Sequence, residues 1–140
     1  MEENFVSAAA RHLMDAKFLS QNNRMDNAGY LAGYAVECSL KAIIMHGRGP
    51  DPKAYGHDLI TLGGAALDLS LLLSPGLRRY RAETIDEIVD AFKDWEPSWR
   101  YRPTGKVSGR AVEILLIAAD KAFDQIIIPI VLDGWGEVPR

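Results

Sequence analysis

The segment from Asp26 to Gly47 constrains the fold more than any other part of the 140-residue chain. Apolar residues recur along it at alternating spacings of three and four, which places them on one face of an α-helix. This first apolar edge comprises Ala28, Leu31, Ala35, Cys38, Ala42 and Met45. A second apolar edge comprises Gly29, Gly33, Val36, Leu40 and Ile43, and the remaining strip holds Tyr30, Tyr34, Glu37 and Lys41. A helix with two apolar sides and one polar strip is expected at the centre of a helical bundle or of a dimer.

The ends of this segment and its glycines make the prediction more specific. Asp26 is a favourable N-cap, and Gly47 is a favourable residue just beyond a helix C-terminus. Gly29 and Gly33 each cost about 1 kcal/mol relative to alanine in a helix interior. That cost indicates that another element, such as a second helix, packs closely against this edge.

The other apolar patterns are also helical, and strand signals are weak. They predict further helices over residues 4–21, from about residue 57 to 69, over 77–95 and from Ser108 onward. Val107 and Val112 are spaced to form a hydrophobic staple around the Ser108 cap, and Pro129 is expected to kink or end the last helix. Because the connections are short, we predict an all-α, up-and-down helical bundle of four to five helices. Residues 1–140 form one domain in this prediction, with an irregular tail from about residue 133.

Composition narrows the chemistry without naming a reaction. The formal net charge is −3, and the lone Cys38 excludes an intramolecular disulfide framework and a cysteine-based zinc finger. The most apolar stretch, residues 114–132, holds four polar side chains, and the N-terminal residues lack the apolar run of a signal peptide. We therefore predict a cytoplasmic protein without a membrane span. There is no Gly-rich phosphate loop, nucleophile elbow or HxxxH spacing, so no cofactor, metal ligand or catalytic residue is predicted.

Candidate binding residues lie on the polar strip of the central helix. Glu37 and Lys41 are four residues apart in the order that favours a helical ion pair. If partly buried, this pair could orient a ligand, and Tyr34 beside it could stack on a base. The favoured alternative is a structural pair that anchors neighbouring helices.

Two other regions offer groups for an anionic ligand. His57, which opens the third predicted helix, could either cap backbone groups or contact a phosphate. The segment 95–110 carries a net charge of +3 and interleaves arginines with aromatic rings, including Arg100, Tyr101 and Arg102. It either binds phosphates and stacks on bases, or its tryptophans are core anchors and its arginines pair with acids of the fourth helix. The sequence leaves both interpretations open.

Four stretches of the chain resemble the HEPN superfamily. They are DNAGYLAGYAVECSLKA at 26–42, ARHLMDA at 10–16, GHDL at 56–59 and the pair Arg100-Tyr101. The resemblance implies a small helical bundle that usually dimerises and that binds or acts on RNA or nucleotides. It also implies association with a small nucleotidyltransferase in a toxin–antitoxin or defence system.

The nuclease motif of that superfamily is absent from this chain. Ribonuclease members carry an arginine, four to six residues and then a histidine near the last helix. The histidines here are His12, His46 and His57, so none follows the arginines of the basic segment, and eight residues separate Arg48 from His57.

Three functions are therefore considered. The first is a non-catalytic module that binds a nucleotide, RNA or a partner protein, with the ligand held by Tyr34, Glu37, Lys41, His57, Arg100, Tyr101 and Arg102. The second is a metal-independent ribonuclease with a displaced catalytic histidine. The third is a purely structural, dimeric interaction protein.

Overall fold

The computed structural model describes residues 4–46, 51–68 and 82–134, and every regular element within these ranges is helical. The predicted all-α fold is thus confirmed. The elements are α1 (Phe5–Gln21), α2 (Met25–His46), η1 (Pro52–Tyr55), α3 (Leu59–Asp68), α4 (Ala82–Ala91), η4 (Pro97–Tyr101), α5 (Gly109–Ala122), η5 (Phe123–Ile127) and α6 (Ile128–Leu132). Within the described part of the chain, no helix is long and apolar enough to cross a membrane.

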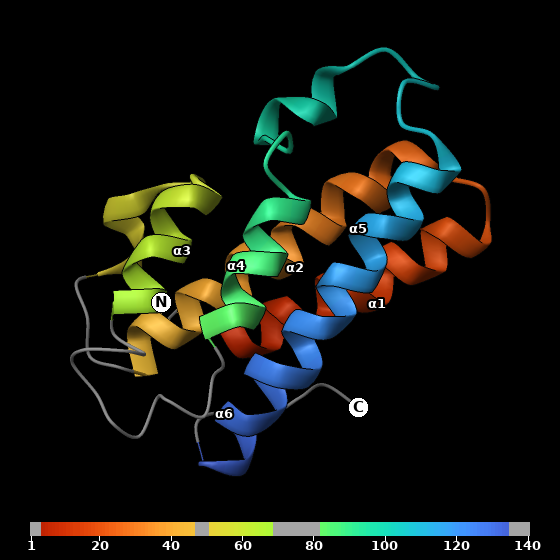
Figure 1. Cartoon of the computed structure of the whole chain (residues 1–140). Coiled ribbons are helices and arrows are strands. Elements are labelled where there is room, and N and C mark those ends of the chain that lie inside the picture. The colour runs from red at the N-terminus through yellow and green to blue at the C-terminus, as the bar shows by residue number, and fades with distance from the viewer. Residues whose placement is uncertain (1–3, 47–50, 69–81, 135–140) are drawn as a thin grey trace.

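Local chemistry sets both ends of α1. The Asn4 side chain caps its start by accepting a hydrogen bond from the Ser7 backbone amide at 2.9 Å. At its end Asn23 adopts a positive φ of 60°, and the Arg24 amide donates back to the Leu19 carbonyl at 2.8 Å. This is a Schellman motif with asparagine in the left-handed position. It turns the chain within three residues, so that α1 and α2 pack antiparallel (Figure 1).

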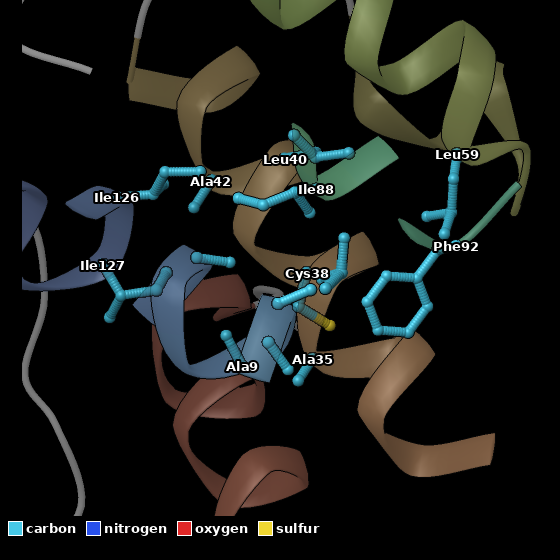
Figure 2. Packing of buried hydrophobic residues seen from close by; sticks show 14 of the residues in the cluster. Ala9, Ala35, Cys38, Leu40, Ala42, Leu59, Ile88, Phe92, Ile126 and Ile127 are labelled. Carbon is cyan, nitrogen blue, oxygen red and sulfur yellow. The ribbon is translucent and has the colours of Figure 1, made fainter. Parts of the chain in front are cut away.

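Helix α2 lies at the centre of the molecule, as its two apolar sides predict. It contacts α1, α3, α5, η4 and η5, and α4 packs against α5 in the antiparallel direction (Figure 1). The core forms where these elements meet. Figure 2 shows α2 contributing Ala35, Cys38, Leu40 and Ala42, which face Ala9, Leu59, Ile88, Phe92, Ile126 and Ile127 from the surrounding helices.

Aromatic side chains pack against the Gly29–Gly33 edge of α2. The helix-propensity cost of these glycines predicts such a close approach but not which element makes it. The indole ring of Trp95 lies directly on Gly33, where a Cβ atom would collide with it. At Gly29 a Cβ atom would lie 3.3 Å from Val107 and 3.5 Å from Trp99. The close approach is therefore real, but much of it comes from the segment between α4 and α5 rather than from a helix alone.

The last helix begins as predicted and continues in an altered form. Ser108 accepts a hydrogen bond from the Ala111 amide at 3.1 Å, and Val107 and Val112 are buried together beside it. Near Pro129 the helix does not end but widens into a π turn, η5, before α6. Because proline lacks an amide hydrogen and its ring crowds the carbonyl four residues earlier, a widened turn accommodates it.

Some sequence expectations need correction. Leu31 is only half-buried where it packs against the core, and Met45 near the end of α2 is exposed. The fourth helix ends at Ala91, four residues before the predicted end at residue 95. Residues 77–81 and most of the expected irregular tail lie outside the described residues.

Candidate functional site

The polar strip of α2 is the meeting point of four segments. Tyr30, Tyr34, Glu37 and Lys41 share this strip because they recur at helical spacing. The turn after η1 brings His57 to it, and α1 brings His12. Arg100 arrives from η4.

Glu37 accepts hydrogen bonds from two neighbours. Lys41 Nζ lies 3.0 Å from Glu37 Oε2, one helical turn along α2. His57 Nδ1 lies 2.9 Å from Glu37 Oε1 and 3.0 Å from Oε2. The i, i+4 spacing predicts the first contact, whereas the second joins residues 20 positions apart.

Burial separates these three residues into two kinds. Glu37 is 3% exposed and Lys41 is 7% exposed, so neither presents its charge to the outside. The side chain of His57 remains 53% exposed. The Glu37–Lys41 ion pair is therefore buried beneath the surface. Of the three residues, only His57 has a side chain that a ligand can reach. The burial of both charges favours the interpretation of Glu37 and Lys41 as a structural pair.

Tyr34 is the centre of an aromatic cluster next to the buried Glu37–Lys41 pair. Its ring centroid lies 4.9 Å from that of Tyr30, 5.3 Å from that of Trp95 and 5.7 Å from that of His57. Burial, reinforced by contact with the Tyr30 side chain, raises the pKa of Tyr34 well above its usual range. Its phenol is therefore neutral at physiological pH.

His12 contributes a second imidazole to the cluster. Its ring centroid lies 5.8 Å from that of Tyr34. Burial, together with the nearby charge of Arg11, lowers the pKa of His12 below that of an ordinary histidine. His12 is consequently neutral at neutral pH.

Arg100 is the exposed cation nearest to this cluster. Contact with the Tyr30 side chain raises the pKa of its guanidinium group, and its charge also acts on Tyr34. Glu37 acts on the same Tyr34 ring. Glu37 and Arg100 therefore both lie close enough to Tyr34 for their charges to act on its phenol.

Tyr101 and Arg102 lie further out, at the exposed edge of η4. The Arg100 guanidinium lies 4.7 Å from the centroid of the Tyr101 ring, and Tyr101 is 75% exposed. The Arg102 guanidinium lies 4.5 Å from the centroid of the Trp99 ring. The structure thus brings Tyr34, Glu37, Lys41 and His57 together, with Arg100 beside them. Tyr101 and Arg102 extend the surface and make no recorded contact with Glu37 or His57.

The two interpretations of the basic segment are now separable. Trp95 is a core anchor and Trp99 is half-buried. Among the described side chains, however, no carboxylate forms an ion pair with Arg100 or Arg102. The α4 acid Glu87 pairs instead with Lys121 of α5. No acid whose side chain the structure describes therefore neutralises Arg100 or Arg102.

Asp26 holds the far end of this basic segment in place. Its carboxylate accepts hydrogen bonds from the backbone amides of Gly105 at 2.9 Å and Val107 at 3.3 Å. Sequence reasoning used Asp26 only as a helix cap and missed this role, because the partners lie about eighty residues away. It also gave little weight to His12, and it left open whether Trp95 is a core anchor.

Comparisons with known proteins add no family. No protein-family model matches the chain, and neither a curated protein nor a solved structure shows significant similarity to it. Among the residues that the structure describes, no three histidine, cysteine or acidic side chains are grouped so as to hold a metal ion.

Proposed function

We propose that this protein is a HEPN-like, non-catalytic module that binds a nucleotide or RNA on the α2–η4 surface. This surface comprises Tyr30, Tyr34, His57, Arg100, Tyr101 and Arg102. The observation that carries the proposal is Arg100, an exposed guanidinium that has no carboxylate partner among the described residues and lies beside the Tyr30–Tyr34 rings.

The chemistry of the surface matches both parts of a nucleotide. Arginine forks bind phosphate oxygens in pairs, and they hold their charge at every physiological pH. The exposed ring of Tyr101 offers a face for a base, a contact that is worth about 1–3 kcal/mol per base in proteins that bind single strands. Neither feature requires a defined sequence of bases.

The test is equilibrium binding of a fluorescent single-stranded RNA at increasing salt concentration. We expect the logarithm of the association constant to fall linearly with the logarithm of the salt concentration. Arg100→Ala should weaken binding at every salt concentration, and it should reduce the slope. Arg24→Ala removes the same charge from the exposed α1–α2 turn and is the matched control. Binding that is insensitive to salt, or equal losses in the two variants, would count against the proposal.

One observation favours the second candidate, a metal-independent ribonuclease. The carboxylate of Glu37 orients the His57 ring much as a positioned acid orients a general base. If this candidate is right, the purified protein should cleave RNA in the presence of a chelator, and His57→Ala should abolish the cleavage. Cleavage that survives in the variant would remove His57 as the catalytic group.

The third candidate concerns partners. The HEPN resemblance implies a homodimer and a nucleotidyltransferase partner in a toxin–antitoxin or defence system. Light scattering of the purified chain would measure its oligomeric state. If co-expression with such a transferase gives a stable complex while RNA does not bind, an interaction protein becomes the better description.

A further inference from the structure

The contact between Glu37 and His57 fixes more than the position of the imidazole ring. An ionised carboxylate offers only acceptors, so the nitrogen that contacts it must carry a hydrogen. In the neutral ring the other nitrogen then holds a lone pair. With Nδ1 at 2.9–3.0 Å from both Glu37 oxygens, the lone pair of neutral His57 is on Nε2. No described residue is recorded as a hydrogen-bond partner of Nε2.

We propose that His57 couples proton uptake to the binding of anions on the α2–η4 surface. A neutral His57 directs the Nε2 lone pair toward an incoming anion, which opposes binding. A protonated His57 presents an N–H donor and a positive charge instead, while its Nδ1 hydrogen bond to Glu37 is unchanged. This inference rests on the proposed function and specifies how the same surface is regulated.

Among the groups around the α2–η4 surface, His57 is the one whose protonation would change the charge that an anion meets. Lys41 already compensates Glu37 beneath the ring, so a proton on His57 adds a positive charge near Arg100. Tyr34 faces the ring as a neutral phenol. His12, on the α1 side, requires a lower pH than an ordinary histidine to become charged, because its pKa is lowered.

Asp58, which follows His57 in the chain, contributes a constant charge. Hydrogen bonds from the Thr61 side chain and backbone lower the pKa of its exposed carboxyl. Asp58 is therefore ionised throughout the range in which histidines titrate, which lies around pH 6.5. A change in anion affinity across that range cannot come from Asp58.

The probe must not titrate in the same range. Phosphate monoesters gain a proton near pH 6, whereas a phosphodiester keeps one negative charge. The dinucleoside phosphate adenylyl-adenosine is therefore the ligand of choice, with the full-length chain as the protein. If one proton is taken up with the ligand, affinity should rise by up to about tenfold per pH unit as the pH falls from 8 to 6.

Two asparagine variants identify the responsible ring. In His57→Asn the amide group can still donate a hydrogen bond to Glu37 but cannot titrate, so binding should persist with a flat pH profile. His12→Asn should keep the wild-type profile. Calorimetry in two buffers of different ionisation enthalpy would measure the proton uptake directly.

Each outcome has a distinct meaning. Binding that depends on Arg100 but is equal at all pH values, or that stays pH-dependent in His57→Asn, would overturn the inference and leave the proposed function intact. A failure of adenylyl-adenosine and RNA to bind at any pH would remove both. A readout without ligand is the tautomer itself: long-range proton–nitrogen spectra at pH 8 should show the hydrogen on Nδ1, and a hydrogen on Nε2 would overturn the inference.

Discussion

Gly33 is the residue at which the sequence and the packing of α2 depend on each other most directly. The indole ring of Trp95 occupies the space that a side chain at Gly33 would need. Gly33→Ala should therefore destabilise the fold by about 1–3 kcal/mol, since the overpacking outweighs the better helix propensity of alanine. Urea unfolding of the variant and the wild type would measure the difference.

Gly64 provides the matched control for this prediction. It also lies inside a helix, α3, but no atom would lie within 4 Å of its Cβ. Gly64→Ala should therefore stabilise the protein by up to about 1 kcal/mol. If both alanine variants shift stability by the same amount in the same direction, the account of Gly33 is wrong.

Asp58 tests the start of α3 and carries a pH dependence. Its side chain accepts hydrogen bonds from the Ile60 amide and from the amide and hydroxyl of Thr61, so Asp58→Ala should cost about 0.5–2 kcal/mol. These hydrogen bonds lower the pKa of Asp58 in the folded state, and the bond from the Thr61 side chain has the largest effect. The contribution of the Asp58 carboxylate to the free energy of unfolding is thus fully present above the pKa that Asp58 has in the unfolded chain. It is lost as the pH falls through the lower pKa that Asp58 has in the folded protein.

The measurement is the stability difference between wild type and Asp58→Ala at neutral pH and in acid. We expect the difference to shrink as the pH drops below about 4, the usual range of an aspartate. Asp58→Asn keeps an accepting oxygen but cannot titrate, so it should retain part of the cap with no pH dependence of its own. A difference that stays constant down to pH 2 would contradict the assignment.

At the residue scale, the spacing of residues along α2 predicted the Glu37–Lys41 contact but not the Glu37–His57 contact. The Glu37–Lys41 contact follows from helix geometry, which any reading of positions four apart can use. The approach of His57 depends on how the segment after α2 folds back, and no periodicity encodes that path. The sequence accordingly named all three residues but could not decide which of them faces the outside.

At the scale of elements, the basic segment between α4 and α5 is held at both ends. Trp95 fixes its start on Gly33, and Asp26 binds the amides of Gly105 and Val107 near its end. Asp26→Ala should therefore increase hydrogen exchange at those two amides. It should also weaken RNA binding, because Arg100 and Arg102 lose their fixed placement.

Asp86→Ala is the control for the Asp26 prediction. Asp86 is an exposed acid on α4, so its removal changes the net charge equally without touching the basic segment. Since removing a negative charge should by itself strengthen RNA binding slightly, weaker binding only in Asp26→Ala would identify the tether. Unchanged exchange at Gly105 and Val107 would show that the segment is held by other contacts.

Elements with strong local signals were predictable, and their partners were not. The periodicity of α2, the Ser108 cap and the Val107–Val112 staple all operate within a few residues, so the sequence is sufficient to predict them. The Gly29–Gly33 edge predicted a close approach but not the ring of Trp95, which lies more than sixty positions away. Pro129 indicated a disturbance, but only tertiary packing decides between a kink, an end and a π turn.

At the scale of the whole molecule, substitutions of the buried Glu37–Lys41 pair can distinguish a role in the stability of the bundle from a role in ligand binding. Glu37 and Lys41 are both buried, so neither charge is exposed to solvent. Buried ion pairs are often neutral for stability when they are compared with apolar residues of similar size, whereas removing one partner leaves an uncompensated charge. A pair whose only task is to anchor helices would therefore be replaceable.

Glu37→Leu and Lys41→Met, singly and together, put this to the test. Each single change should cost about 3–5 kcal/mol, while the double variant should unfold at nearly the wild-type urea concentration. The double variant should nevertheless bind adenylyl-adenosine with a weaker pH dependence than the wild type. Without Glu37, neutral His57 can carry its hydrogen on Nε2 and donate it to the anion, so that protonation adds only the positive charge. A double variant that keeps the wild-type pH dependence would reduce the pair to a structural role, and one as unstable as the single variants would show that the bundle cannot fold around apolar residues there.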